Sequence, residues 1–160
     1  MEQTKVVIRA ATRGDIPAIV GLGEELIDFH QARDPFFTWA DNGSGLFAKF
    51  IDENIRNDAV RVLVATVDGK IVGYCQGMLD QHPPVLAEPQ YGQILDLMVT
   101  AEYRGAGIGE RMFKTLCDWF RGEGIRRIEV RHSTANEIAA RFWPKMGFQP
   151  YLLTLFRELP

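Results

Sequence analysis

The 160-residue sequence has only two cysteines and three histidines, so it is poor in the side chains that form disulfides and metal centres. Cys75 and Cys117 lie far apart, with no C-x-x-C pair and no histidine cluster between them. We interpret both as small buried apolar residues, which suits a reducing cytoplasm. The sequence therefore predicts neither a disulfide framework nor a metal site.

Long apolar runs are also lacking. No run approaches the roughly 18 residues of a membrane span, and no charged-then-apolar leader opens the sequence. The net charge of −3 gives no bulk attraction to nucleic acid. We therefore expect a cytoplasmic protein without membrane or nucleic-acid partners. Acidic residues predominate over positions 1–100 and basic residues over 101–160, which suits either a site joining a cation to an anion or ordinary solvated surface.

The hydrophobic pattern predicts one mixed α/β domain over residues 1–160, with no repeat and no internal linker. Two β-type runs flank Asp68-Gly69, the favoured two-residue hairpin turn. The other expected elements are strands at 6–9, 93–99 and 151–159, a strand after the turn at 122–124, and helices at 15–30, 47–55, 109–121 and 136–143.

A strand, a glycine-rich loop and a helix follow one another around Y-R-G-A-G-I-G-E-R-M, residues 103–112. Glycines let backbone N–H groups turn toward an anion, and the start of the helix adds positive potential. The dinucleotide fingerprint G-x-G-x-x-G fails, because Glu110 stands where its third glycine would fall. A Walker A loop needs a G-K-[ST] ending that is missing. What remains is Arg104-x-x-Gly107-x-Gly109.

This loop resembles the R/Q-x-x-G-x-G/A loop of the GNAT superfamily of N-acetyltransferases, which holds the pyrophosphate of acetyl-CoA. The resemblance covers nearly the whole chain in the family's order, including the V-A-T-V-D-G-K-I-V-G-Y-C-Q-G hairpin, I-L-D-L-M-V, and N…A-A-R-F-W…M-G-F. It implies an α/β fold with a mixed, mostly antiparallel sheet of six to seven strands. Helices would cover both faces, and strands four and five would splay apart.

The resemblance implies acetyl-CoA as co-substrate, with no metal. Backbone N–H groups of the loop would wrap the two phosphates, and the fourth strand would bind the pantetheine arm. Asn136 would contact that arm, or serve only as a helix N-cap. Phe142 and Trp143 would lie near the thioester, although Phe142 is equally well explained as core. The residues expected to contact acetyl-CoA are Leu97, Met98, Val99, Arg104, Gly105, Ala106, Gly107, Ile108, Gly109, Glu110, Asn136, Phe142 and Trp143.

Acetyl transfer to an amine requires a base for the amine proton and a donor for the carbonyl oxygen. Regular strand alternation would place Ile94, Asp96 and Met98 on one face, with the carboxylate between two apolar side chains. Burial would raise the pKa of Asp96 and improve it as a base. Pairing of Asp96 with a loop or an arginine is the alternative. Family resemblance makes the Met98 N–H the expected oxyanion donor.

The position that carries the general acid in the family is occupied by a different residue here. Trp143 replaces the usual tyrosine, and an indole N–H is too weak an acid to protonate a thiolate. Tyr91, Tyr151 and His132 are candidate substitutes, and water is another because a thiolate leaves readily. For His132, an inward-pointing core histidine on the strand of Ile128 is the favoured interpretation.

In the family, the first two helices and the loop between them form the wall that binds the amine acceptor. The resemblance therefore implies that His30, Asp34 and Phe37 lie at the acceptor site. Aromatic rings with a carboxylate suit a cationic amine, although a hydrophobic plug or a dimer contact explains them equally well.

The sequence thus predicts an N-acetyltransferase acting on a small-molecule, amino-acid or protein amine by direct transfer in a ternary complex, as a homodimer. The alternatives are a non-catalytic acyl-CoA-binding module, supported by Trp143, and a nucleic-acid-binding domain, disfavoured by the net charge.

Overall fold

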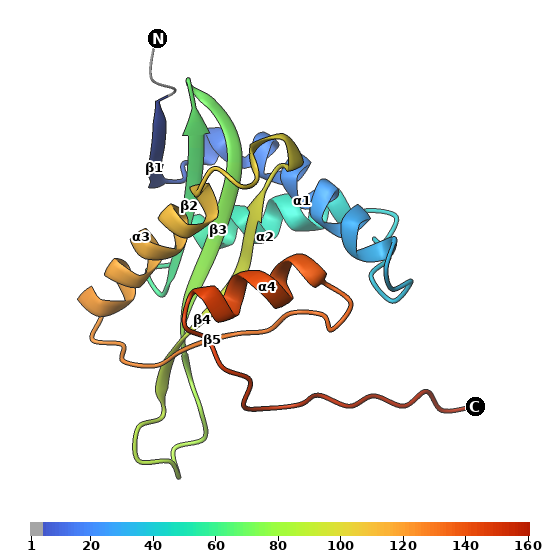
Figure 1. Cartoon of the computed structure of the whole chain (residues 1–160), viewed down its shortest axis with the longest axis vertical. Coiled ribbons are helices and arrows are strands. Elements are labelled where there is room, and N and C mark those ends of the chain that lie inside the picture. The colour runs from blue at the N-terminus through green and yellow to red at the C-terminus, as the bar shows by residue number, and fades with distance from the viewer. Residues whose placement is uncertain (1–4) are drawn as a thin grey trace.

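The computed structural model describes residues 5–160, which form one five-stranded sheet between two layers of helices (Figure 1). The strands follow the chain order, with the first four antiparallel and the fifth parallel to the fourth. The elements are β1 (Val6–Ala10), α1 (Ile16–Gln31), α2 (Gly43–Ile55), β2 (Val60–Val67), β3 (Lys70–Gln81), β4 (Gln90–Val99), α3 (Ile108–Gly122), β5 (Ile128–Val130) and α4 (Glu137–Lys145).

The hairpin between β2 and β3 turns where the sequence predicts it. Asp68 has φ of 49° and Gly69 has φ of 85°, so two successive residues adopt the left-handed conformation of a type I′ turn. None of the helices within residues 5–160 is long and apolar enough to cross a membrane.

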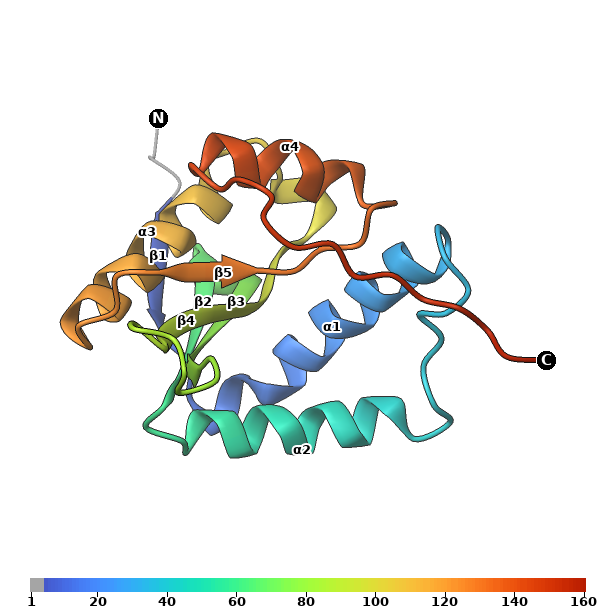
Figure 2. The same ribbon diagram turned by 90° about the horizontal axis from the view of Figure 1, so that it is seen from below.

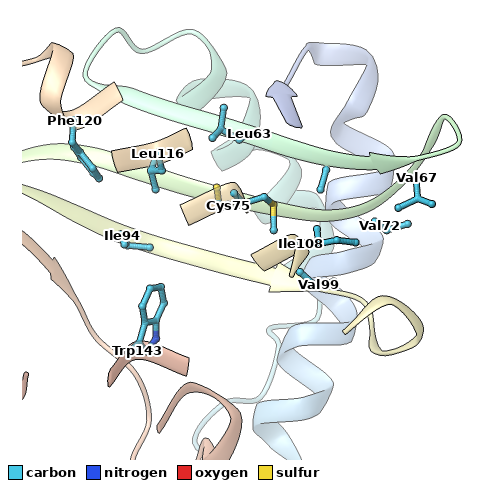
Figure 3. Close-up of a cluster of buried hydrophobic side chains, with 12 residues drawn as sticks. Leu63, Val67, Val72, Cys75, Ile94, Val99, Ile108, Leu116, Phe120 and Trp143 are labelled. Atoms are coloured by element: carbon cyan, nitrogen blue, oxygen red, sulfur yellow. The ribbon is translucent and has the colours of Figure 1, made fainter. Parts of the chain in front are cut away.

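Two apolar cores fill the space between the sheet and its helices. Helices α3 and α4 cover one face, and α1 and α2 cover the other (Figure 2). Ile108, Met112, Leu116 and Phe120 recur every four residues along α3, so they form one buried stripe. Figure 3 shows this stripe lying over the strands, with Trp143 joining the same cluster from α4.

The α3 layer approaches the sheet closely because a glycine of β4 lies beneath the buried ring of Phe120. A Cβ atom built on Gly92 of β4 would lie 2.4 Å from the Phe120 ring. We expect Gly92→Ala to lower the free energy of unfolding by about 1–3 kcal/mol, the usual cost of overpacking a core. Urea denaturation would measure the loss, and Phe120→Leu in the same background should restore part of it. Gly21→Ala is the control, because nothing lies within 4 Å of that Cβ position on α1.

Asp15, the residue before α1, is held by several hydrogen bonds. Arg9 donates two hydrogen bonds to the Asp15 carboxylate, at 2.7 and 2.9 Å, and the Thr12 backbone N–H donates a third at 2.7 Å. These donors, led by Arg9, lower the pKa of Asp15 from 3.8 to about 2. A depressed carboxyl pKa contributes stability above pH 3.8 that is lost as the pH falls through about 2.

We therefore expect Asp15→Asn to lower the free energy of unfolding at pH 7 by about 1–2 kcal/mol, allowing for solvent around the partly exposed Arg9. The difference from the unsubstituted chain should disappear near pH 2. Exposed Asp58 provides the control substitution Asp58→Asn. An equal loss for both variants, or a loss independent of pH, would contradict this role.

The predicted strand count of six to seven is wrong, because residues 151–159 form no strand. The segment is extended and exposed, and no backbone hydrogen bond joins it to another element of the described chain. Its apolar pattern matches a strand, but a strand also needs a neighbour for its N–H and C=O groups. The sheet therefore ends at β5, which is only three residues long.

Candidate active site

A β-bulge interrupts the fourth strand next to the predicted base. Gln76 of β3 pairs with Asp96, and the next residue, Gly77, pairs with Ile94, so Leu95 is the extra residue. The bulge reverses the side-chain alternation. Ile94 joins the core under α3, whereas Met98 joins the core under α1 and α2. The prediction that Ile94, Asp96 and Met98 share one face is therefore wrong for Ile94.

Beyond the bulge, β4 and β5 separate. Their pairing covers only Gly92–Ile94 against Ile128–Val130, so the C-terminal half of β4 has no partner on that side. A cavity of about 320 Å³ lies there, between β4, the glycine loop, α1 and α4. Most of the residues expected to contact acetyl-CoA line this cavity. They are Leu97, Met98, Val99, Arg104, Gly105, Gly107, Ile108, Gly109, Glu110, Asn136, Phe142 and Trp143.

The glycine loop has the backbone conformation of an anion-binding turn. Gly105 and Gly107 have φ of 81° and 75°, and a Cβ atom at either would meet nothing within 4 Å. Gly107 precedes the first residue of α3, so the first N–H groups of that helix have no intrahelical acceptor. Within the described chain, no hydrogen-bond acceptor is found for the N–H groups of Gly105, Ala106 and Gly107. Several donors therefore converge on one open turn.

Glu25 of α1 anchors the start of this loop. Its carboxylate accepts from the Thr100 hydroxyl at 2.8 Å and from the Ala101 backbone N–H at 3.1 Å. It also lies 3.7 Å from Arg104 Nη2, while Arg104 Nε donates to the Val99 carbonyl at 2.8 Å. The Arg104 guanidinium is thus held beside the end of β4, between the loop and α1.

Asp96 lies in a network of neutral polar side chains. Gln76 Nε2 donates to Asp96 Oδ2 at 2.7 Å, and Asn54 of α2 donates to Gln76 Oε1 at 2.8 Å. Burial raises the pKa of Asp96, and hydrogen bonds from Gln76 and Tyr74 oppose the rise. Gln76 and Tyr74 are almost fully buried. No arginine or lysine pairs with Asp96 in the described chain, so burial remains the largest influence on its pKa.

Helix α4 supplies the far wall of the cavity. Asn136 Oδ1 accepts from the Ala139 N–H at 2.9 Å, so it is the N-cap, while its amide nitrogen remains available to donate. Trp143 is buried, and the ring of Phe142 meets it edge-on at 4.9 Å. The N-cap and ligand-contact interpretations of Asn136 are therefore compatible.

The predicted acceptor residues lie together, but outside this cavity. The rings of His30 and Phe37 are 4.9 Å apart, and Asp34 accepts from the Phe36 backbone N–H at 3.0 Å. Burial, with a smaller contribution from Arg33, lowers the pKa of His30. His30 is therefore largely neutral at pH 7, whereas Asp34 provides a carboxylate beside two aromatic rings.

None of the candidate general acids lines the cavity. The Tyr91 hydroxyl donates to Asp80 at 2.9 Å, and burial raises the pKa of Tyr91 to about 12. Tyr151 donates to Glu129 on β5. His132 is exposed beyond the end of β5, so its interpretation as an inward-pointing core histidine is wrong. The strand stops at Val130, and the alternation that was extended to His132 stops with it.

Sequence reasoning missed several groups around the site. Leu26 and Phe29 of α1 line the cavity, as does Tyr103, and Glu25 anchors the loop. Leu26 and Phe29 lie one helical turn apart, and an apolar spacing of this kind predicts burial without saying what lies opposite. Only the fold brings α1 against the loop that begins 75 residues later, as the bond from Thr100 to Glu25 shows.

The comparisons with known proteins agree with this geometry. The model of the acetyltransferase (GNAT) family matches residues 26–148, which is most of the chain. The chain belongs to the GNAT family. An uncharacterised N-acetyltransferase of Methanocaldococcus jannaschii is 34% identical over 87 residues, covering 54% of this chain and 51% of that protein. The chain thus spans about half the length of this curated relative.

Solved structures show the GNAT fold over nearly the whole length. A tetramutant of the BH1408 protein from Bacillus halodurans has a TM-score of 0.84 at 25% identity, covering 96% of this chain and 99% of that one. A predicted acetyltransferase from Clostridium acetobutylicum, solved with acetyl-CoA, has a TM-score of 0.76 at 19% identity, covering 96% of each chain. The predicted fold class is therefore confirmed, apart from its number of strands.

Proposed function

We propose that this chain is an N-acetyltransferase that moves an acetyl group from acetyl-CoA to a primary amine by direct transfer in a ternary complex. The observation that carries the proposal is the open turn at Gly105–Gly107, where free backbone N–H groups and the start of α3 face the cavity. Such donors suit the pyrophosphate of acetyl-CoA. Family membership and the acetyl-CoA complex of the Clostridium acetobutylicum protein support the same donor.

The gap between β4 and β5 suits the pantetheine arm. On this unpaired side of β4, the backbone groups of Leu97 and the N–H of Val99 are available to bind amides of the arm, whereas the Val99 carbonyl already accepts from Arg104. The Asn136 side-chain amide nitrogen lies on the opposite wall. Phe142 and Trp143 close the apolar end, where the thioester would be shielded from water.

In the proposed reaction the amine nitrogen attacks the thioester carbonyl, the C–N bond forms and the C–S bond breaks. Asp96 takes the amine proton, directly or through a water, and its raised pKa suits that role. The Thr100 N–H donates to the Val72 carbonyl of β3, so by alternation the Met98 N–H also points toward β3. The neighbouring Leu97 N–H, on the open side of β4, is therefore proposed in its place to stabilise the carbonyl oxygen as it gains negative charge. The thiolate then takes a proton from water, because none of the three candidate acids reaches the cavity.

The side chains of Asp96 and Met98 lie on the face of the sheet that α1 and α2 cover, so the amine would approach from that side. His30, Asp34 and Phe37 lie at the end of α1 and offer one carboxylate beside aromatic rings. This combination suits a cation on an apolar body, whether a small molecule, an amino-acid derivative or a protein N-terminus or lysine.

We also propose that residues 1–160 form a single domain, that the protein is cytoplasmic and that it forms a homodimer.

A panel of amines and peptides, screened with acetyl-CoA for release of free thiol, tests the proposal. We expect at least one class of amine to raise thiol release well above the rate of acetyl-CoA hydrolysis. The second candidate function is a non-catalytic acyl-CoA-binding module, favoured by the buried Trp143 at the usual position of the acid. Tight acetyl-CoA binding without thiol release for any amine would establish that module and overturn the enzyme.

A further inference from the structure

A polar network of three side chains crosses the apolar layer between α2 and the sheet. Asn54 Nδ2 donates to Gln76 Oε1 at 2.8 Å, and Gln76 Nε2 donates to Asp96 Oδ2 at 2.7 Å. Asn54 is 7% exposed, and Gln76 is fully buried. The network therefore connects the last turn of α2, through β3, to the proposed base on β4.

Packing alone gives no reason for an amide at position 76. Tyr74 and Met78, two residues before and after Gln76 on β3, pack in the apolar core under α1 and α2. An amide buried in such a layer costs free energy unless new hydrogen bonds replace those it made with water. Apolar side chains of the same shape would fill the space without that requirement. The side-chain partners of Gln76 within residues 5–160 are Asn54 and Asp96, so its role lies with them.

The orientation of the Gln76 amide decides which group Asp96 meets. An ionised carboxylate only accepts hydrogen bonds, whereas an amide has donors on its nitrogen and an acceptor on its oxygen. Burial raises the pKa of Asp96, and the amide nitrogen opposes that rise by stabilising the ionised form. An amide turned by 180° would present its oxygen instead, which favours the protonated carboxyl. Asn54 selects the first orientation, because its N–H donates to the Gln76 oxygen.

The other groups around Asp96 are neutral or do not act on it. Tyr74 and Cys75 of β3 interact with Asp96, but burial raises the pKa of the hydroxyl and of the thiol, so both stay uncharged near neutral pH. Glu25 of α1 and Arg104 lie 3.7 Å apart near the end of β4. No charged group of α1, α2 or β5 within residues 5–160 contributes to the pKa of Asp96. Burial and neutral donors therefore determine its charge.

We propose that Gln76 and Asn54 are positioning residues for Asp96. Asn54 fixes the Gln76 amide with its nitrogen toward the carboxyl group, and this donor holds the buried carboxyl in the ionised form that a base requires. Neither residue touches a substrate, since both act through Asp96. The catalytic consequence rests on the proposed function, whereas the control of the carboxyl group does not.

Carbon-13 NMR of the Asp96 carboxyl, titrated without acetyl-CoA and assigned with Asp96→Asn, tests this role. Gln76→Met removes the donor at similar volume, so the pKa of Asp96 should rise by about one unit or more. Asn54→Leu frees the amide to turn, so the pKa should rise there as well. A variant that only loosened the packing would admit water and lower the pKa, because burial is the main cause of its elevation.

Thr66→Val is the control for both variants. It removes a buried hydroxyl from β2 at a position that pairs with Ile71, outside the polar network, so the pKa of Asp96 should stay unchanged. Circular dichroism checks that each variant is folded, and the two positions test the role separately. An unchanged or lowered pKa in Gln76→Met would overturn the role of both residues. The same result in Asn54→Leu alone would overturn the role of Asn54.

Initial rates with the best amine of the panel give the second measurement. A rise of one unit in the pKa of the base should lower kcat about tenfold at pH values below that pKa, and the loss should shrink as the pH rises. The KM for acetyl-CoA should change little, because neither residue lines the cavity. A raised pKa with an unmoved rate profile would overturn the catalytic role. If no amine is acetylated, the proposed function fails by itself, and the carboxyl titration still decides whether Asn54 and Gln76 control Asp96.

Discussion

Replacing Gly107 with glutamate should weaken acetyl-CoA binding by about 100-fold or more. The residue has φ of 75°, a conformation that costs a residue with a Cβ atom roughly 1–2 kcal/mol. The new carboxylate would also project into the open turn where the two phosphates are proposed to bind, because a Cβ atom there meets no other group within 4 Å. Together, strain and charge repulsion of about 3 kcal/mol correspond to this factor. Isothermal titration with acetyl-CoA measures it.

Gly124→Glu is a matched control for this experiment. Gly124 also has φ of 75° and open space around its Cβ position, but it lies in the turn after α3. Both variants therefore carry the same backbone strain and the same added charge. Gly124→Glu should bind acetyl-CoA within about twofold of the unsubstituted chain, since that ratio corresponds to only about 0.4 kcal/mol. Equal losses in the two variants would show that strain or net charge, rather than the position of the loop, determines binding.

Asp96→Asn should lower kcat by roughly 100-fold or more, the usual contribution of a general base. The pKa of Asp96 is raised by burial, so the unsubstituted enzyme should gain activity as the pH rises through that raised value. The variant should lack this rise. Its KM for acetyl-CoA should change little, because Asp96 does not line the cavity. Initial rates from pH 5 to 9, with the best amine of the panel, would measure both effects.

Stability provides an independent readout of the same carboxyl group. A carboxyl whose folded pKa is raised stabilises the fold fully at low pH and loses that contribution as the pH rises through the folded pKa. Asp96→Asn carries no charge, so its melting temperature should exceed that of the unsubstituted chain at pH 8 and match it more closely near pH 4. Asp80→Asn is the control on β3, and its kcat should stay within about twofold, because Asp80 accepts hydrogen bonds from Tyr91 and the Gln81 N–H and does not line the cavity. Unchanged turnover and pH dependence in Asp96→Asn would remove Asp96 from the base role.

Much of the site could be predicted because its chemistry is local in sequence. The Asp68-Gly69 turn and the loop from Arg104 to Gly109 depend on backbone conformations that few residues other than glycine adopt readily, so the sequence itself marks them. The side chains that line the cavity from β4 also follow from the position of that loop, since β4 leads directly into it.

The bulge at Leu95 could not be predicted from β4 alone, because the glycine at the shift in register, Gly77, lies on the facing strand β3. It depends on the fit of β4 against β3 and α3, and it moves Asp96 and Met98 to the opposite face from Ile94. A strictly alternating strand would have placed the proposed base under α3, away from the α1–α2 side. The contact of Glu25 with the glycine loop was equally hidden, since it arises only when α1 packs against the end of β4.

The C-terminal segment shows a different limit of sequence reasoning. Its apolar residues predict a strand, and this prediction is wrong, because a strand is defined by its neighbour and the described chain provides none.

The most direct test of the account is a crystal structure with acetyl-CoA bound. In that structure the two phosphates should accept hydrogen bonds from backbone N–H groups between Gly105 and Glu110, and the pantetheine arm should lie between β4 and α4. A structure in which these amides face only solvent, while the nucleotide binds elsewhere on the chain, would contradict it.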